Sequence, residues 1–313
     1  MQQLRLEEIR PILPSRIVDN FHLQTIRRGA MSVKVPKSNN FLNFIQTRSE
    51  KHTLSNPDPE KTKKHDRVWD FLLNYYFRFE MFGWENLPPS PSMLVSVHSG
   101  TWLTMDAWAL CAHWWRKFQS ERILHGTAHD VLMSLPILGE YFSNMGVIPA
   151  KSASISSAFD VGHDVVIWPG GELDAMRSWS KRGKVVLGNR KGFIRLAIRS
   201  GVPIVPVATY GGHNTVIVLS ECRKIAKILR CKKYLRSEIL PLVLGFPFGI
   251  AFEVLPIHIP LPAKIRSQIL APITVDTDPE KANDNNYVDR IYKEIEGSLQ
   301  DGVDELQRFR RPK

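Results

Sequence analysis

The sequence predicts an α/β fold, in which helices flank a largely parallel central sheet. Short apolar runs alternate with helix-like stretches through the middle of the chain, and two of these runs end in turns that carry His98 and Gly170. Alternating short buried strands and helices are typical of such a sheet. The 313 residues are 43% hydrophobic and 23% charged, which supports a sizeable core and excludes a disordered or collagen-like chain.

The expected strands are short apolar runs bounded by turn residues. They comprise residues 93–97, 122–126, 146–149, 164–169 and 203–210. The expected helices comprise residues 68–82, 106–118, 132–144 and 192–200. Near the C-terminus, apolar residues recur at steps of three or four, at Val288, Ile291, Ile295, Leu299, Val303 and Leu306. This spacing predicts one amphipathic helix packed on the outside of the domain.

The first part of the chain is expected to lie outside the folded domain. Residues 32–66 are rich in Lys, Ser, Asn, Pro and Asp and show no sustained period, as in a linker. We therefore expect residues 1–66 to form a polar extension and residues 67–313 to form the functional domain. The first thirty residues carry charges throughout and contain no apolar h-region, so no secretory signal peptide is expected.

The charge balance favours partners that carry phosphate groups. Basic residues outnumber acidic ones by 42 to 31, a net charge of +11, which suits a nucleic acid, an anionic membrane or a phosphorylated cosubstrate. Cys111, Cys222 and Cys231 form an odd set without C-x-x-C spacing, which argues against a disulfide framework and a zinc site. A reducing compartment is expected.

Two adjacent stretches point to a membrane surface. Residues 223–236 (RKIAKILRCKKYLR) combine seven positive charges with apolar residues and carry no negative charge, as in an interfacial helix. Residues 239–252 follow as an uncharged apolar run, shorter than the roughly 20 residues of a spanning helix, and this run must fill a core or touch lipid. Because no nucleic-acid motif accompanies the charge, an anionic membrane is favoured as the partner over nucleic acid.

The first candidate for chemistry is His98, which directly follows a predicted strand. Asp106 comes eight residues later, where a helix is expected to begin. Strand ends of parallel sheets are where ligands bind, and a carboxylate in reach of a histidine lets the ring act as a general base. The alternative is that Asp106 is only a helix N-cap and His98 a structural loop residue. Ser99 is a poor nucleophile candidate because it neighbours His98 in an extended segment, where adjacent side chains point in opposite directions. No G-x-S-x-G turn is present either.

The second candidate is the turn after the predicted strand at 164–169 (WPGGELDAMR from Trp168). Its two glycines allow a ligand to approach backbone N–H groups, and charges of both signs follow them. The alternative is an ordinary turn with a solvated rim. Residues 181–199 are strongly basic without an acidic residue, which makes them a candidate for binding phosphates. His125 and His129 could line the same cleft, but without a third ligand nearby no metal site is expected.

Taken in order, four blocks resemble the successive motifs of the glycerolipid acyltransferase superfamily: His98 with Asp106, then residues 135–150, 168–179 and 186–212. The resemblance covers about residues 67–272 and is closest to the branch of type 2 diacylglycerol acyltransferases and actinobacterial phospholipid/glycerol acyltransferase-like proteins. The sequence departs from the superfamily twice. Seven residues separate the histidine and the aspartate, against four in the usual H-x4-D motif. The usual P-E-G-T block is Pro-Gly-Gly-Glu, as in the diacylglycerol branch.

The resemblance implies a membrane-peripheral acyltransferase at the cytoplasmic face of a membrane. It would move a fatty acyl group from acyl-CoA or an acyl-carrier protein to the hydroxyl of a glycerolipid or glycolipid, without a metal or other cofactor. His98 would be the general base and Asp106 its partner. The expected substrate-binding residues are Gly170, Gly171, Glu172, Asp174, Arg177, Arg190 and Lys191.

The Pro-Gly-Gly-Glu block at residues 169–172 also bears on which lipid serves as acceptor. Gly170 stands where lysophosphatidate enzymes of the superfamily carry a glutamate, so the resemblance implies an acceptor with a neutral hydroxyl region rather than a phosphomonoester. Two other functions stay open at this point. One is a lipid or acyl-thioester hydrolase that uses the same histidine, and the other is a non-enzymatic lipid-binding protein, which would not need His98.

Overall fold

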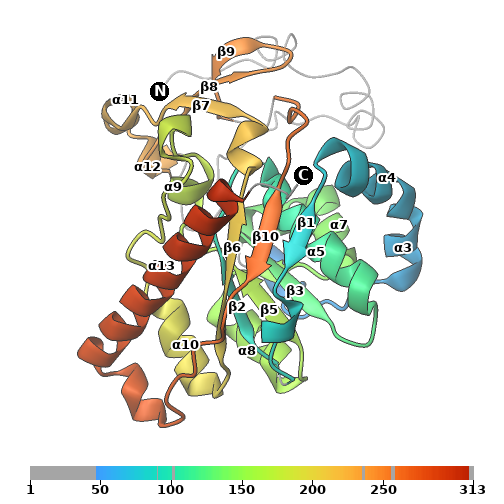
Figure 1. Ribbon diagram of the computed structural model, residues 1–313, viewed down its shortest axis with the longest axis vertical. Helices are drawn as coiled ribbons and strands as arrows, with labels where there is room; N and C mark the ends of the chain where they lie inside the picture. The colour runs from blue at the N-terminus through green and yellow to red at the C-terminus, as the bar shows by residue number, and fades with distance from the viewer. Residues whose placement is uncertain (1–46, 90, 101–102, 235–236, 255–257, 310–313) are drawn as a thin grey trace, which may run out of the picture. The chain divides into compact units, whose positions relative to one another are not determined.

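A seven-stranded sheet organises the part of the chain that the computed structural model describes, residues 47–89, 91–100, 103–234, 237–254 and 258–309 (Figure 1). The strand order is β1-β10-β6-β2-β5-β3-β4. The strands from β6 to β4 pair in parallel, whereas β10 runs antiparallel to β6 and carries β1 at the edge. The predicted largely parallel sheet is confirmed. The strands are β1 (Glu80–Phe82), β2 (Met93–Ser96), β3 (Leu124–Ala128), β4 (Ile148–Pro149), β5 (Asp164–Ile167), β6 (Ile204–Tyr210) and β10 (Arg266–Ile269).

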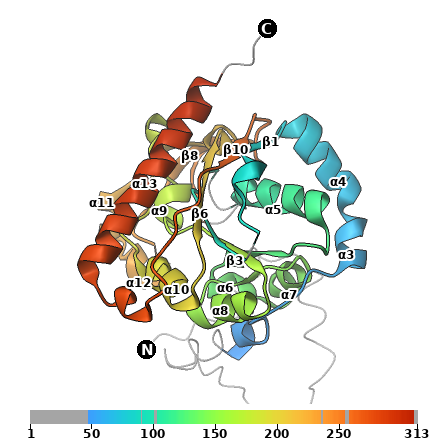
Figure 2. The ribbon, with the colours of Figure 1, turned by 60° about the horizontal axis from the view of Figure 1, so that its bottom comes forward.

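Helices cover both faces of this sheet. On one face α8, α10 and α13 pack against Met93 and Val95 of β2, and on the other α4 and α5 pack against Leu94 (Figure 2). Successive residues of a strand point to opposite faces, so both need apolar cover. The helices are α3 (Pro59–Lys64), α4 (Asp66–Phe71), α5 (Met105–Phe118), α6 (Asp130–Ser134), α7 (Pro136–Asn144), α8 (Ser152–Asp160), α9 (Glu172–Ala175), α10 (Gly192–Ser200), α11 (Arg223–Ile228), α12 (Cys231–Tyr234) and α13 (Asn285–Arg308).

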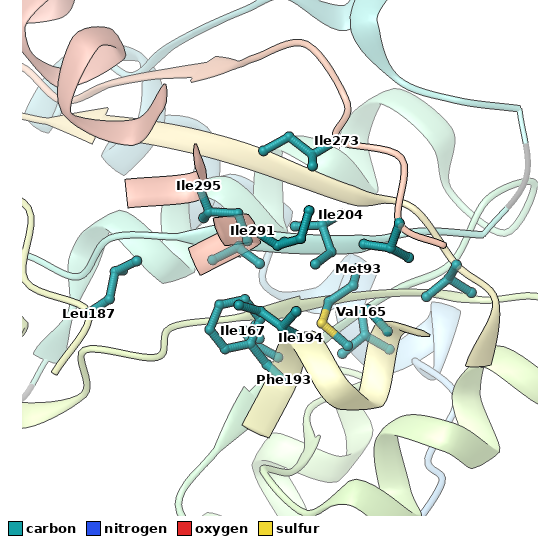
Figure 3. Packing of buried hydrophobic residues seen from close by; sticks show 14 of the residues in the cluster. Met93, Val165, Ile167, Leu187, Phe193, Ile194, Ile204, Ile273, Ile291 and Ile295 are labelled. Carbon is teal, nitrogen blue, oxygen red and sulfur yellow. The ribbon is translucent and has the colours of Figure 1, made fainter. Parts of the chain in front are cut away.

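The C-terminal helix α13 closes one face as predicted. Asp284 caps it by accepting hydrogen bonds from the backbone N–H groups of Asn286 and Tyr287. All six apolar residues of the expected stripe are buried, and Ile291 and Ile295 meet residues of the sheet and of α10 in one cluster (Figure 3). Gly302 lies so close to β6 that a Cβ there would be 2.7 Å from the Cβ of Ala208.

The structure differs from the sequence-based expectation at three helices. The helix expected at 68–82 ends earlier: α4 continues as a π-helical turn, Leu72–Tyr76, and the chain then enters β1. An apolar run by itself does not distinguish a buried helix from a short strand. The helix expected at 132–144 is divided into α6 and α7 at Leu135, because the residue before a proline disfavours the helical conformation. The basic segment forms two short helices, α11 and α12, separated by Arg230 with φ 53°.

The apolar run at 239–252 does not form a helix. It supplies β8 (Leu242–Gly245) and β9 (Gly249–Phe252), which pair with β7 (Ile217–Ser220) in a separate antiparallel sheet. Neither this sheet nor β10 was expected from the sequence. None of the helices in the described residues is both long and apolar enough to cross a membrane.

All described residues belong to the unit Leu42–Lys313. Residues 1–46 of the predicted extension lie outside the described residues. The later part of that extension contacts the domain, since Ser55 hydrogen-bonds Ser143 of α7 at 2.6 Å and Lys61 hydrogen-bonds Asn144 at 3.0 Å. The predicted boundary at residue 66 stays a prediction.

Candidate active site

A cavity of about 610 Å³ lies at the carboxyl ends of the parallel strands. His98 follows β2 into it, and Trp168 follows β5. The remainder of its lining is largely aromatic and aliphatic: Trp69, Trp108, Trp115, Leu132, Phe142 and Val147. The site is therefore a mostly apolar pocket with a few polar groups at the strand ends, the usual composition of a ligand site.

The structure brings His98 and Asp106 together. Asp106 lies buried in the first turn of α5, and its Oδ2 is 3.4 Å from Nδ1 of His98. This is longer than a well-formed hydrogen bond, as is common where no substrate is bound. Asp106 is not the N-cap, because that position belongs to Thr104. Since the contact uses Nδ1, the ring atom left for a substrate is Nε2.

Asp174 and Arg177 hold the backbone of His98. Both side chains are fully buried, and Asp174 accepts a hydrogen bond from the His98 N–H. Arg177 pairs with the Asp174 carboxylate and donates to the carbonyl of His98 at 3.2 Å. Burial raises the pKa of Asp174 to about 6, against the opposing effect of the Arg177 guanidinium. Neither residue lines the cavity, although both were expected to bind substrate.

The other residues predicted to bind substrate divide into two groups. Gly171, Glu172 and Arg190 line the cavity, and Arg190 pairs with Glu172 at 3.2 Å. Gly170 instead packs tightly on backbone, since a Cβ there would lie 2.0 Å from the carbonyl oxygen of Val186. Lys191 faces α13, where its Nζ lies 2.7 Å from Asp289.

The basic stretch 181–199 does not form one phosphate-binding face. Lys181 pairs with Glu221, Arg195 donates to the Ala282 carbonyl and to Asn285, and Arg199 donates to Asn283. Among the cations of this stretch, Arg190 is the one that lines the cavity within the described part of the chain. The basic side chains of this stretch mainly link α10 and the turn before it to α13 and to the segments that precede α13 and follow β7.

The two histidines at β3 have separate surroundings. His129 lines the cavity and caps α6, where it accepts from the N–H of Val131. His125 is buried away from the cavity, between the carbonyl of Gly146 at 2.8 Å and His163 at 2.9 Å. Burial lowers the pKa of His125 to about 4. Within the described residues, no group of three or more metal-ligating side chains is gathered.

Sequence reasoning missed the aromatic residues of the site. The ring of Trp168 stacks on that of His98. Four further tryptophans of the cavity lining come from residues 66–116. A signal was present in the sequence, since Trp108 and Trp115 lie seven residues apart and therefore on one face of α5. Periodicity alone predicts that face as core, and the cavity is visible only once α5, α7 and β3 are placed together.

Comparison with known proteins gives a consistent result. Residues 44–307 match the family model described as diacylglycerol acyltransferase. An uncharacterized protein of Mycobacterium tuberculosis is 24% identical over 242 residues, 77% of this chain and 65% of that protein. A DGAT1/2-independent enzyme synthesizing storage lipids from Gallus gallus is 28% identical over 180 residues, 58% of this chain and 52% of that protein. The chain thus spans somewhat less than two thirds of the length of these relatives.

Two further similarities are more limited. Diacylglycerol O-acyltransferase 2 of Homo sapiens is 34% identical over 83 residues, 26% of this chain and 21% of that protein. The crystal structure of a 1-acyl-sn-glycerophosphate acyltransferase from Thermotoga maritima covers 87% of this chain and 91% of its own, with a TM-score of 0.48 and 18% sequence identity.

Proposed function

Because the chain belongs to the diacylglycerol acyltransferase family, we propose that it transfers a fatty acyl group from a thioester to the hydroxyl of a lipid at a membrane surface. One observation carries the proposal. His98, with buried Asp106 beside Nδ1, lines the same cavity as a set of aromatic side chains. The cavity thus combines a base with a mostly apolar lining that suits an acyl chain.

In this mechanism His98 acts through Nε2. It takes the proton of the acceptor hydroxyl while the oxygen attacks the thioester carbonyl carbon, and an O–C bond forms. The C–S bond then breaks, and the proton passes from the imidazolium to the leaving thiolate. Asp106 orients the ring and stabilises its positive charge. General-base catalysis of this kind contributes about 10² to 10⁴ in rate, and positioning of the two substrates supplies the remainder.

The apolar walls suit the acyl chain of the donor. Trp69, Trp108 and Phe142 come from three different elements and line the cavity as one aromatic cluster, since the ring of Trp108 lies 5.9 Å from that of Trp69 and 5.3 Å from that of Phe142. Each methylene group that leaves water there contributes about 0.8 kcal/mol to binding. The donor in this proposal is acyl-CoA or an acyl-carrier protein, which serves as cosubstrate, and the mechanism requires no metal or prosthetic group.

The polar end of the cavity favours an acceptor without a phosphomonoester. Its Arg190 is already paired with Glu172, and Arg116 of the same lining is paired with Asp70, so little positive charge is left to meet nearly two negative charges. We therefore infer a partial glyceride or a glycolipid as acceptor. A water-soluble thioester and a lipid can meet at a membrane surface, so the proposal includes a peripheral location at the cytoplasmic face of a membrane.

The test uses the purified full chain, labelled acyl-CoA and a panel of lipid hydroxyl acceptors. Acyl transfer that depends on both the acceptor and His98 supports the proposal. Release of free fatty acid at the same rate with and without acceptor would identify a thioester hydrolase instead. Lipid binding without turnover of any acyl donor would identify a binding protein.

A further inference from the structure

The small sheet β7–β8–β9 has one apolar face that no part of the described chain covers. Leu244 lies opposite Ile250 across the β8–β9 hairpin, and Leu242 lies opposite Phe252. Side chains two residues apart on a strand point the same way, so these four residues share one face. Leu244 is 40% exposed and Ile250 is 62% exposed.

The opposite face of this sheet is the buried one. Val243 packs with Val216 and Val218 in a small cluster, and Gly245 lies against His258. An antiparallel sheet with one face in water alternates apolar and polar residues. Here both faces are apolar, which explains why the sequence shows an uninterrupted apolar run instead of a period of two.

The hairpin turn extends the exposed apolar surface. Phe246 and Phe248 are each 62% exposed, and Ile259, which bridges to Phe246, is 53% exposed. Single exposed apolar residues are common, but a contiguous patch marks an interaction site. We call the outer face of β8 and β9 together with this turn the hairpin face. Figure 1 shows the hairpin beyond the end of β6.

Positive charge lies at the Leu242–Phe252 end of the hairpin face, because Ser220 at the end of β7 pairs with Leu242. Helix α11 begins three residues after β7 ends and carries Lys224 and Lys227, which form no ion pair with any described residue. The same helix exposes Ile228 and leads to exposed Leu229. Exposed apolar side chains beside unpaired cations are the combination that binds an anionic bilayer surface.

The hairpin face also lies at the end of the molecule that holds the cavity. β6 leads within seven residues into β7, so the small sheet follows the carboxyl end of a parallel strand. Ser237 lines the cavity, and Ile239, two residues further, packs against Ala175 and Met176 of the cavity wall. Contact between the hairpin face and a lipid surface therefore brings the cavity close to that surface.

We propose that the hairpin face, with α11 beside it, docks the protein onto an anionic lipid bilayer and that Phe246 and Phe248 enter the apolar layer. A second copy of the chain fits less well. Residues 242–252, which form most of this face, carry no carboxylate that a second copy could offer to Lys224 and Lys227. A bilayer that contains anionic lipid satisfies the apolar and the basic parts together.

The experiment measures flotation of the full chain with two kinds of vesicle, phosphatidylcholine alone and equal parts of phosphatidylcholine and phosphatidylglycerol. The combined change Phe248→Ser and Ile250→Thr should lower the partition coefficient at least tenfold on both. The combined change Lys224→Glu and Lys227→Glu should lower it at least tenfold on the anionic vesicles, with a weaker dependence on salt. Val161→Thr is the matched control, because Val161 is 51% exposed near the opposite ends of the strands, and its partition should equal that of the wild type.

Two outcomes would overturn the proposal. One is wild-type flotation of the Phe248→Ser, Ile250→Thr variant. The other is a concentration-dependent dimer in sedimentation that the same changes dissociate, which would make the hairpin face an interface between copies. The role of docking, to bring the cavity to its lipid acceptor, rests on the proposed function. Docking itself is tested independently, because flotation needs no substrate. A loss of flotation with unchanged transfer to a detergent-dispersed acceptor separates docking from catalysis.

Discussion

The imidazole of His98 lies flat on the indole of Trp168, with ring centroids 4.7 Å apart and an angle of 2° between the planes. The pairing of Val95 with Ile167 places the ends of β2 and β5 side by side, so that each strand delivers one ring. A cation over an aromatic face is attracted by the ring quadrupole, and tryptophan attracts it most strongly. Trp168 is thus placed to stabilise the imidazolium that forms when His98 accepts a proton.

Substitutions of Trp168 separate this electrostatic role from packing. Phenylalanine keeps an aromatic face, whereas leucine keeps apolar bulk without one. We expect kcat to fall in the order Trp, Phe, Leu, with Trp168→Leu at least tenfold below the wild type, about 1.4 kcal/mol in the transition state. KM for the acyl donor should change less. Equal kcat for the Phe and Leu variants would mean that the indole only fills space.

The clamp formed by Asp174 and Arg177 predicts a change in stability. Asp174→Asn leaves the buried guanidinium of Arg177 without its counter-charge, which costs about 3–5 kcal/mol of unfolding free energy. Urea unfolding measures this loss directly. Glu172→Gln serves as the comparison, because Glu172 lines the cavity and pairs with partly exposed Arg190, and it should cost less than about 1 kcal/mol. Similarly small losses of unfolding free energy in Asp174→Asn and Glu172→Gln would show that the pairing of Asp174 with Arg177 does not stabilise the fold as proposed.

His125 predicts an acid-dependent loss of stability. Its pKa falls from the ordinary 6.5 to about 4 in the folded chain because of burial. Between these pH values the unfolded chain binds more protons, so the unfolding free energy decreases as the pH falls, by at most about 1.4 kcal/mol per pH unit from this group. His125→Asn keeps a donor for the Gly146 carbonyl but does not titrate, so the slope should become shallower. A slope equal to that of the wild type in His125→Asn would contradict this account.

The pairing of Arg190 with Glu172 predicts which acceptor is used better. Diacylglycerol or a glycolipid should react faster than lysophosphatidic acid at matched donor concentration, because Arg190 and Arg116 in the cavity lining are already paired with Glu172 and Asp70. Glu172→Gln frees Arg190 and should raise the relative rate with lysophosphatidic acid. A preference of the wild type for lysophosphatidic acid by tenfold or more, about 1.4 kcal/mol, would show that the phosphate is met by other groups.

The sequence predicted the parallel strands and α13 because both depend on local patterns. Short apolar runs that end in His98 and Pro169, and a stripe from Val288 to Leu306, need no knowledge of distant neighbours. The strand β1 was missed because its apolar residues continue those of a helix. The hairpin of β8 and β9 was missed because apolar residues occupy both faces.

The site was predicted less completely than the fold. The proximity of His98 and Asp106 follows from a strand end and the next helix start, so local reasoning brought them together. The inward orientation of Asp174 and Arg177 depends on a turn that folds back on the His98 backbone. Sequence alone assigns such charges to a solvated or ligand-facing rim, because their burial arises only from tertiary packing.

Acyl transfer by His98→Ala tests the central claim most directly. The variant, assayed with labelled acyl-CoA and a diacylglycerol or glycolipid acceptor, should show no transfer above background while it unfolds at the wild-type urea concentration. Asp106→Asn should retain more activity than His98→Ala and still fall well over tenfold below the wild type, because it removes the charge that stabilises the imidazolium. Transfer by His98→Ala at the wild-type rate would contradict the mechanism.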